Sequence, residues 1–305
     1  MLRSNAIPST LTSDVGRKSY QNLFSDYLAL TKPKIITLLV ITAIGAMFLA
    51  QQGVPSISLM ALVVAGGSLG AGGANALNHY LDRAIDSHMK RTSRRPVPGG
   101  RIKPVHALIF GVALNVIAFA ILAVWVNLLS ALLTLSATVF YAVIYTIWLK
   151  RSTTQNIVIG GASGAVPPLV GWAAVTGGLS LPAWYLFAIV FFWTPPHFWA
   201  LALLLKNDYA SAKVPMLPVV RGVEETARSI LLHTLLLVTI TILFFTTRAV
   251  GTPYVYGATA LGVVFLFMSW KLFRTPTVAM ARRLYLFSLL YLTLLFILIL
   301  ADSLV

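Results

Sequence analysis

The sequence of 305 residues contains no cysteine. The chain can therefore form no disulfide, and it offers neither a thiolate metal ligand nor a cysteine nucleophile. Charged residues are also scarce, at 10% of the chain, where soluble domains carry about 25%. With 58% hydrophobic residues and a mean hydropathy of +0.85, the chain cannot cover a water-facing surface. These shortages exclude both a soluble enzyme and an intrinsically disordered chain.

Nine mainly apolar segments are long enough to cross a membrane as helices, which takes roughly 20 residues each. They cover about 35–50, 57–81, 105–126, 128–149, 156–175, 183–205, 229–249, 254–270 and 284–301. The sequence thus predicts an all-α membrane protein. It has a polar N-terminal segment, residues 1–34, and a nine-helix domain, residues 35–301.

Acidic residues are few, 8 against 23 lysines and arginines. If the nine segments alternate across the membrane, 22 of the 23 basic residues lie on one side, and Arg248 stands alone on the other. Basic residues are enriched in cytoplasmic loops, so we expect the N-terminus inside and the C-terminus outside. Two extended inside loops are expected, residues 82–104 and 206–228. The first 34 residues show no apolar signal-peptide core, and the missing organelle transit signal favours a bacterial cell inner membrane over a mitochondrial one.

The inner end of the second segment carries three oxygen-bearing side chains at intervals of four, Asn78, Asp82 and Asp86. Residues four apart lie on one face of a helix. Magnesium prefers oxygen ligands, and proteins typically hold it with one or two carboxylates plus substrate phosphates. The spacing therefore indicates a magnesium site at the end of this helix.

Basic residues follow this triad at Arg91, Arg94 and Arg95. Guanidinium groups bind phosphate through paired hydrogen bonds, so metal-binding carboxylates beside them are typical of a site for a diphosphate. The alternative is a set of helix-end charges that pair with Arg83 or Lys90 at the membrane interface. Ionisable groups near the membrane are costly and usually functional, which favours the diphosphate site.

The second long loop contains Lys206, Asp208 and Lys213. One aspartate and two lysines could hold a second magnesium ion and the other end of a diphosphate. No carboxylate follows four residues after Asp208, because Ala212 occupies that position. By itself the segment is an ordinary polar loop, and its similarity to the first loop is what suggests a shared site.

The sixth segment contains two consecutive prolines, Pro195 and Pro196, followed by His197. Prolines remove backbone donors and break or kink a helix, and broken membrane helices are tolerated where they line a cavity. His197 could then ligate haem iron, as histidine commonly does, or it could hydrogen-bond a carbonyl that the prolines leave free.

Three sequence runs together resemble the protohaem IX farnesyltransferases, or haem O synthases, of the UbiA-type superfamily of intramembrane prenyltransferases. The runs are "DYLALTKPKI", "NHYLDRAIDSHMKRTSRRPVPGGRI" and "FFWTPPHFWALALLLKNDYASAKVPMLPVV". The resemblance extends from about residue 26 to the ninth segment. The "TPPHFW" and "DYASAKVPMLP" parts are specific to these enzymes, whereas the Asn/Asp triad marks the wider superfamily.

This resemblance implies a bundle of nine helices around a central cavity. It implies transfer of a farnesyl group from farnesyl diphosphate to a vinyl group of protohaem IX, with addition of water and loss of diphosphate. Asn78, Asp82 and Asp86 would form the first metal motif and Asp208 the second, with Mg²⁺ as cofactor and haem as substrate. Expected partners are the two substrates, the lipid bilayer and, further along, haem A synthase or terminal oxidase assembly, with no nucleic acid.

Three other functions remain to be compared. A related enzyme could prenylate a quinone precursor or chlorophyllide, which "TPPHFW" argues against. A transporter of haem or of an organic anion could also use broken helices, but the outer side here has almost no polar loop. A non-catalytic protein of oxidase assembly would not need the metal triad.

Overall fold

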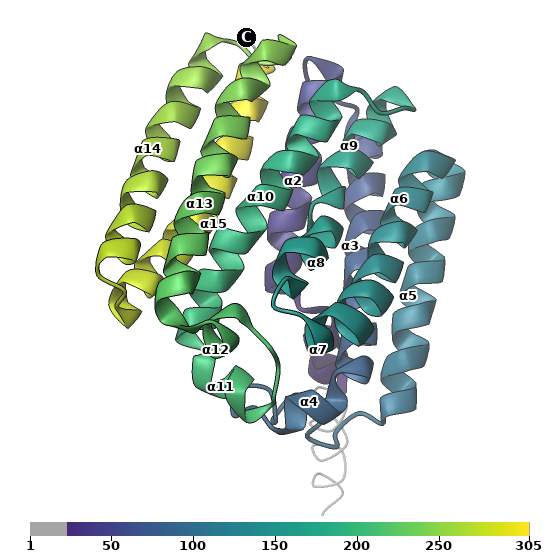
Figure 1. The fold of residues 1–305 in the computed structure, drawn as a ribbon. Coiled ribbons are helices and arrows are strands. Elements are labelled where there is room, and N and C mark those ends of the chain that lie inside the picture. Colours follow the sequence, from purple (N-terminus) through teal and green to yellow (C-terminus); the bar gives the residue numbers. More distant parts are fainter. Residues whose placement is uncertain (1–22, 305) are drawn as a thin grey trace, which may run out of the picture.

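The computed structural model of the protein describes residues 23–304, and every regular element among them is a helix (Figure 1). Nine helical segments there are long and apolar enough to cross a membrane, which confirms the predicted all-α fold. Five are single helices: α2 (Pro33–Gln51), α3 (Ile57–Leu81), α5 (Pro104–Trp125), α10 (Leu181–Leu204) and α14 (Thr252–Arg274). A sixth is α15 (Val278–Asp302).

The other three spans are built from consecutive pieces of helix. The fourth joins α6 (Leu128–Val139), the π-helix η1 (Phe140–Leu149) and α7 (Lys150–Ser152). The fifth joins α8 (Asn156–Gly164) to α9 (Val166–Thr176), and the seventh joins α13 (Gly222–Leu243) to the 3-10 turn η2 (Phe244–Thr247). Most of the polar N-terminal segment predicted for residues 1–34 lies outside the described residues, although residues 23–31 are helical.

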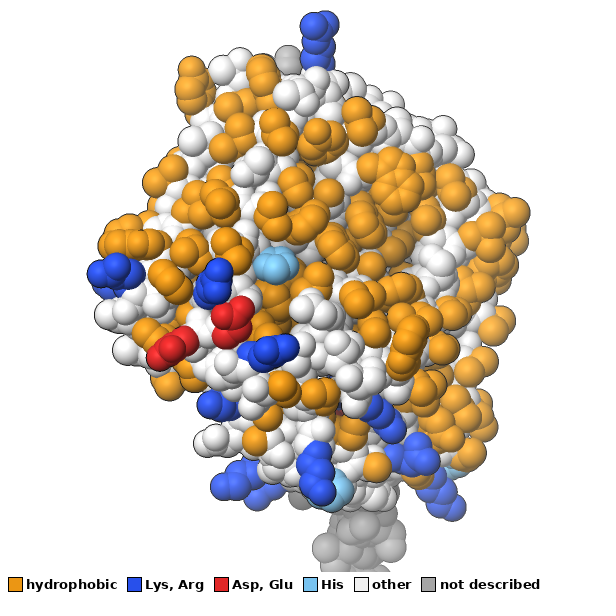
Figure 2. Space-filling view, viewed as in Figure 1, with side chains coloured by type: hydrophobic (Ala, Val, Ile, Leu, Met, Phe, Trp, Pro, Cys, Tyr) orange, Lys and Arg blue, Asp and Glu red, His pale blue; other side chains and the backbone are white. Residues whose placement is uncertain are grey.

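Short helices cap one end of the bundle. These are α4 (Arg83–Ser87), α11 (Lys206–Ser211) and α12 (Leu217–Val220), and Figure 1 shows them with α7 at the end opposite the C-terminus. The two long loops therefore meet at one end of the molecule. Figure 2 shows Lys and Arg side chains gathered toward that end, with hydrophobic side chains covering the rest of the visible face.

Two spans differ from the sequence prediction, the seventh in where it begins and the sixth in its continuity. The seventh span begins at Gly222 rather than near residue 229, because α13 starts with a polar turn that includes Glu224 and Glu225. Acidic residues are favourable in a first helical turn, so the helix extends beyond its apolar part and shortens the predicted loop 206–228.

The sixth span, α10, continues through Pro195 and Pro196. The break expected there is absent.

Close backbone contact between helices sets the positions of the spans. A Cβ atom added to Gly171 on α9 would lie 2.1 Å from the carbonyl oxygen of Ala43 on α2. Small residues allow this approach in lipid, where tight packing replaces the hydrophobic effect as the force between helices. The approach holds α2 against the fifth span and so fixes the start of α2, which contributes to the polar site.

Candidate active site

The first predicted motif spans the junction between two helices. α3 ends at Leu81, and Asp82 follows with φ −88° and ψ 0° before α4 begins. This sparsely populated backbone region often holds active-site residues. Asn78 donates a hydrogen bond from Nδ2 to Oδ2 of Asp82 over 2.7 Å. Asn78, Asp82 and Asp86 are all at most 3% exposed, so the structure buries the whole triad.

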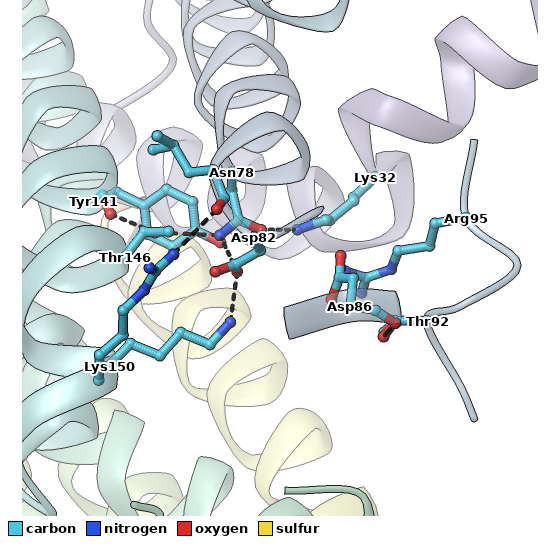
Figure 3. A network of polar contacts seen from close by, with 11 residues as sticks. Lys32, Asn78, Asp82, Asp86, Thr92, Arg95, Tyr141, Thr146 and Lys150 are labelled. Carbon is cyan, nitrogen blue, oxygen red and sulfur yellow. Dashed lines mark hydrogen bonds and ion pairs between the residues drawn. The ribbon is translucent and has the colours of Figure 1, made fainter. Parts of the chain in front are cut away.

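Each member of the triad is paired with a cationic side chain (Figure 3). Lys32 donates to Oδ1 of Asn78 over 2.9 Å, Lys150 forms an ion pair with Oδ2 of Asp82, and Arg95 forms one with Oδ2 of Asp86 over 2.7 Å. The sequence-based interpretation singled out Arg95 alone of these cations. Asp86 therefore turns to the loop arginine, while Asn78 and Asp82 face the two lysines.

Lys32 and Lys150 come from segments remote from the triad in sequence, 46 residues before Asn78 and 68 residues after Asp82. Lys32 occupies the left-handed backbone region, with φ 52°, a strain of about 1–3 kcal/mol that is typical of functional sites. Burial, together with the Arg95 and Lys150 charges, lowers the pKa of Lys32 to about 7. An anion bound nearby would favour its charged form.

The π-helix η1 shapes the wall beside Asp82. Thr146 donates a hydrogen bond to the carbonyl of Tyr141 over 2.8 Å and accepts one from Asn78 over 3.2 Å. The rings of Tyr141 and Tyr145 stack with centroids 5.6 Å apart. π-helical turns are rare and frequent at functional sites. This one places aromatic faces and a threonine hydroxyl next to the triad, a feature that the hydropathy of the segment does not reveal.

His79 is buried next to the triad. It is 2% exposed, and neither ring nitrogen has a hydrogen-bond partner within the described part of the chain. Buried polar groups normally have partners, so an enclosed histidine directly beside Asn78 is an unusual feature of the site.

The second predicted motif lies at the same end of the molecule but in a separate pocket. Asp208 on α11 lines a pocket of about 430 Å³ together with His88 and Lys90. Ser211 ties the two loops together by donating to the carbonyl of His88 over 3.2 Å. Neither Asp82 nor Asp86 lines this pocket, so the structure brings the two loops together without joining all three aspartates in one cluster.

Tyr209 fills the space between the two motifs. It is 9% exposed, and burial raises the pKa of its hydroxyl. Lys206 is half-buried, while the remaining predicted phosphate ligands, Arg91, Arg94 and Lys213, are exposed. They lie on the water-facing surface of the loops, and they make no described contact with an aspartate.

The donors of the triad are hard oxygen atoms, a type that suits magnesium. Among residues 23–304, no group of three or more His, Cys, Asp or Glu side chains is close enough to hold a metal by itself. However, Oδ1 of Asp82 is buried without a partner, and Asn78 and Asp86 add hard oxygen atoms. Magnesium usually completes such an incomplete protein site with substrate phosphates. The residues present therefore fit a magnesium–diphosphate complex.

His197 lies apart from the aspartates, on the inward face of α10. Its Nδ1 is 2.7 Å from Oγ of Ser288 on α15, and the residue is 6% exposed. No described bond links it to a backbone carbonyl, which was one of the two roles that the sequence left open.

Comparison with known proteins identifies the family to which the chain belongs. Residues 38–296 match the family model of the UbiA prenyltransferase family. A curated relative from Gloeobacter violaceus, named protoheme IX farnesyltransferase, is 51% identical over 280 residues, which are 92% of each chain. A relative of the same name from Roseiflexus castenholzii is 53% identical over 281 residues, which are 92% of this chain and 52% of that protein. The chain thus spans about half the length of the Roseiflexus relative.

Solved structures share the fold at low sequence identity. A digeranylgeranylglyceryl phosphate synthase superimposes with a TM-score of 0.76 and 18% identity, covering 92% of this chain and 98% of that one. A UbiA homologue from Archaeoglobus fulgidus, solved with DMAPP and Mg²⁺ bound, gives a TM-score of 0.68 and 15% identity, covering 90% and 99%.

Proposed function

Because the chain belongs to the UbiA prenyltransferase family, we propose that it transfers a farnesyl group from farnesyl diphosphate to a vinyl group of protohaem IX. The observation that carries the acceptor assignment is the identity of about half of all residues with a Gloeobacter relative named protoheme IX farnesyltransferase, over 92% of both chains. The polar site at the loop end supports the donor assignment.

The diphosphate end of the donor would bind between the triad and its three cations. Asn78, Asp82 and Asp86 would hold magnesium, which when bound withdraws charge from the leaving diphosphate. Lys32, Lys150 and Arg95 would lose their present partners to the metal and turn their charges to phosphate oxygens. Asp208, Lys206 and Lys213 would hold the outer end of the diphosphate, with Arg91 and Arg94 at the mouth.

The transfer forms a carbon–carbon bond and breaks a carbon–oxygen bond. The C1–O bond of the farnesyl group breaks, and its electron pair leaves with diphosphate. The π electrons of the vinyl group form a bond from its terminal carbon to C1. Water then adds to the cationic carbon next to the porphyrin ring and loses a proton, which gives a farnesylhydroxyethyl haem. The stacked faces of Tyr141 and Tyr145 can stabilise the allylic cation.

The membrane location follows from both substrates. The nine apolar helices make the chain a multi-pass membrane protein, and farnesyl diphosphate and haem both partition into lipid. We assign it to a bacterial inner membrane, with the loop end in the cytoplasm where soluble diphosphate is made and released. Its product would pass within the bilayer to haem A synthase or to terminal oxidase assembly.

Purified full-length protein in lipid nanodiscs would test this proposal. Release of diphosphate from farnesyl diphosphate would be measured with haem, a hydroxybenzoate or a hydroxynaphthoate as the single acceptor, each with and without Mg²⁺. We expect magnesium-dependent release with haem only. Release with either aromatic acid, and none with haem, would replace the acceptor while leaving prenyl transfer in place.

A further inference from the structure

The imidazole of His197 is fixed on three sides by residues of α10 and α15. Trp193 stacks on it with ring centroids 4.4 Å apart and an interplanar angle of 18°. Tyr285 stacks at 4.8 Å and 29°, and Nδ1 lies 2.7 Å from Oγ of Ser288. Trp193 is itself fixed, because its Nε1 donates to the carbonyl of Ser288 over 2.7 Å. The ring therefore has one defined orientation.

The hydrogen bonds of Ser288 determine the tautomer of this ring. The Ser288 hydroxyl donates its proton to the carbonyl of Tyr285 over 2.7 Å. A hydroxyl carries one proton, so while that proton points to the Tyr285 carbonyl, Oγ accepts from His197 and Nδ1 bears the hydrogen. In the neutral imidazole the lone pair then resides on Nε2. His197 thus presents an unprotonated nitrogen at its remaining edge.

Nε2 of His197 is the ring nitrogen that has no partner among the described residues. No residue from 23 to 304 makes a hydrogen bond with this atom. Nor is it one of the fully enclosed polar atoms without a partner, which include both nitrogens of His79. Nε2 of His197 is therefore accessible at its edge, whereas both ring nitrogens of His79 are enclosed.

From this arrangement, and resting on the proposed function, we propose that His197 binds the iron of the acceptor porphyrin through Nε2. Histidine ligands of metals typically donate their other ring hydrogen to a fixed acceptor, which sets the tautomer and orientation. Neutral imidazole is also a common axial ligand of haem iron. Ser288 is the fixed acceptor here, and Trp193 and Tyr285 prevent the ring from rotating.

The position of His197 suits a role in orienting the acceptor. His197 precedes Asp208 along α10 and α11 by a helical rise of roughly 16 Å. The iron would therefore bind deep in the membrane, away from the phosphate-binding residues, and the edge of the macrocycle would extend toward the loop end. His197 would thus select an iron porphyrin over an iron-free one and fix which edge approaches the prenyl donor.

The test is a spectroscopic titration of full-length protein in nanodiscs with ferric protohaem and, separately, with iron-free protoporphyrin IX. Wild-type protein should give the Soret and electron paramagnetic resonance signals of a nitrogen-ligated haem, and His197→Ala should lose them. Added imidazole should restore the signals to this variant. Affinity for iron-free protoporphyrin should be the same in both proteins, because that ligand lacks the iron.

Ser288 and His233 provide the matched variants. Ser288→Ala, which leaves the imidazole without its acceptor, should weaken haem binding about tenfold, and Ser288→Thr should restore it. His233 also bonds through Nδ1, to the carbonyl of Ser229 over 2.9 Å, but it lies on a different helix, α13. His233→Ala should therefore leave the haem spectrum and the affinity for haem unchanged.

Two outcomes separate this inference from the proposed function. A wild-type spectrum without a nitrogen ligand, or an unchanged spectrum in His197→Ala, would overturn the iron ligation. Farnesylated haem formed by the same preparation would show that the enzymatic assignment still stands. If wild-type protein binds no haem and farnesylates none, the proposed function itself fails.

Discussion

At the scale of single residues, the buried triad of Asn78, Asp82 and Asp86 is the part of the fold that most needs a functional explanation. Burial of polar and charged side chains costs stability. Asp82 is paired with Lys150 through Oδ2, but its buried Oδ1 has no partner, and an unsatisfied buried acceptor costs free energy. A fold optimised for stability alone would have no reason to retain this atom. Its persistence is explained by a cation that binds during the reaction.

We predict that Asp82→Asn and Asp86→Asn each reduce turnover by roughly 10²–10³, the usual cost of losing one electrostatic stabiliser of the transition state. Asp208→Asn should also impair turnover, through the outer part of the diphosphate site. Initial rates over a range of Mg²⁺ concentrations would be measured after membrane insertion is verified. Glu225→Gln is the control, because Glu225 is exposed at the start of α13. Near-normal, magnesium-dependent rates in any aspartate variant would remove that residue from the metal site.

Lys150 provides a second prediction, because it pairs with Oδ2 of Asp82, next to the free Oδ1 of the same carboxylate. Lys150→Gln should weaken binding of inorganic pyrophosphate with Mg²⁺ by about tenfold to a hundredfold, since a hydrogen bond to a charged group is worth about 1.5–3 kcal/mol. Binding of Mg²⁺ alone should not weaken. Calorimetric titrations with and without pyrophosphate would measure both. The control is Arg151→Gln, whose side chain donates only to the carbonyl of Leu81. An equal loss of both affinities would reduce Lys150 to a structural partner.

The sequence predicts part of this site and omits part for a clear reason. The contact between Asn78 and Asp82 is local, at a spacing of four, so helical periodicity is sufficient to predict it. Lys32 and Lys150 reach the triad only through tertiary packing, and in the sequence they resemble ordinary basic residues of cytoplasmic loops. The burial of His79 is equally invisible, because nothing in its neighbours distinguishes a sealed histidine from a solvated one.

At the scale of helices, interruptions rather than regular turns shape the site. The helix boundary at Asp82 separates Asp86 from its predicted face and directs it to Arg95. The π-helix turns Tyr141, Tyr145 and Thr146 to the triad. Hydropathy places the nine spans because length and apolarity decide insertion. It does not report hydrogen-bond register within a span, so neither interruption could be predicted.

Gly171 is the sharpest test of helix packing. Gly171→Ala would place a methyl group 2.1 Å from the backbone of Ala43, and backbone cannot rotate away as a side chain can. We expect a loss of about 1–3 kcal/mol in stability, seen as a lower midpoint of thermal unfolding in nanodiscs. Gly164→Ala in the same span meets no atom within 4 Å and should leave the midpoint unchanged. Equal midpoints for the two variants would contradict the close approach of α2 and α9.

At the scale of the whole molecule, chemistry and charge share one end. The short helices of both loops lie opposite the C-terminus (Figure 1), and the basic residues gather toward that end (Figure 2). Such a one-sided arrangement suits an enzyme that exchanges a water-soluble diphosphate with one compartment. A transporter needs polar access at both ends of the bundle, whereas the polar loops here gather at one end (Figure 1).

The orientation of the chain stays a prediction from charge. With 22 of 23 basic residues assigned to one side, we expect the N-terminus in the cytoplasm and the C-terminus outside. Alkaline phosphatase fused after Val305 should be active, and the same enzyme fused after Lys206 should be inactive. An inactive C-terminal fusion beside an active loop fusion would invert the assignment.

The most direct test of the account is the pigment made by a bacterial host that lacks its own haem-farnesylating enzyme and expresses this chain. Haem would be extracted from the membranes of this host, and its molecular mass would be measured by mass spectrometry. The account predicts protohaem enlarged by one farnesyl group and one hydroxyl group, absent from the same host expressing Asp82→Asn. Unmodified haem together with a prenylated hydroxybenzoate or hydroxynaphthoate would contradict the haem assignment and leave an intramembrane prenyltransferase with another acceptor.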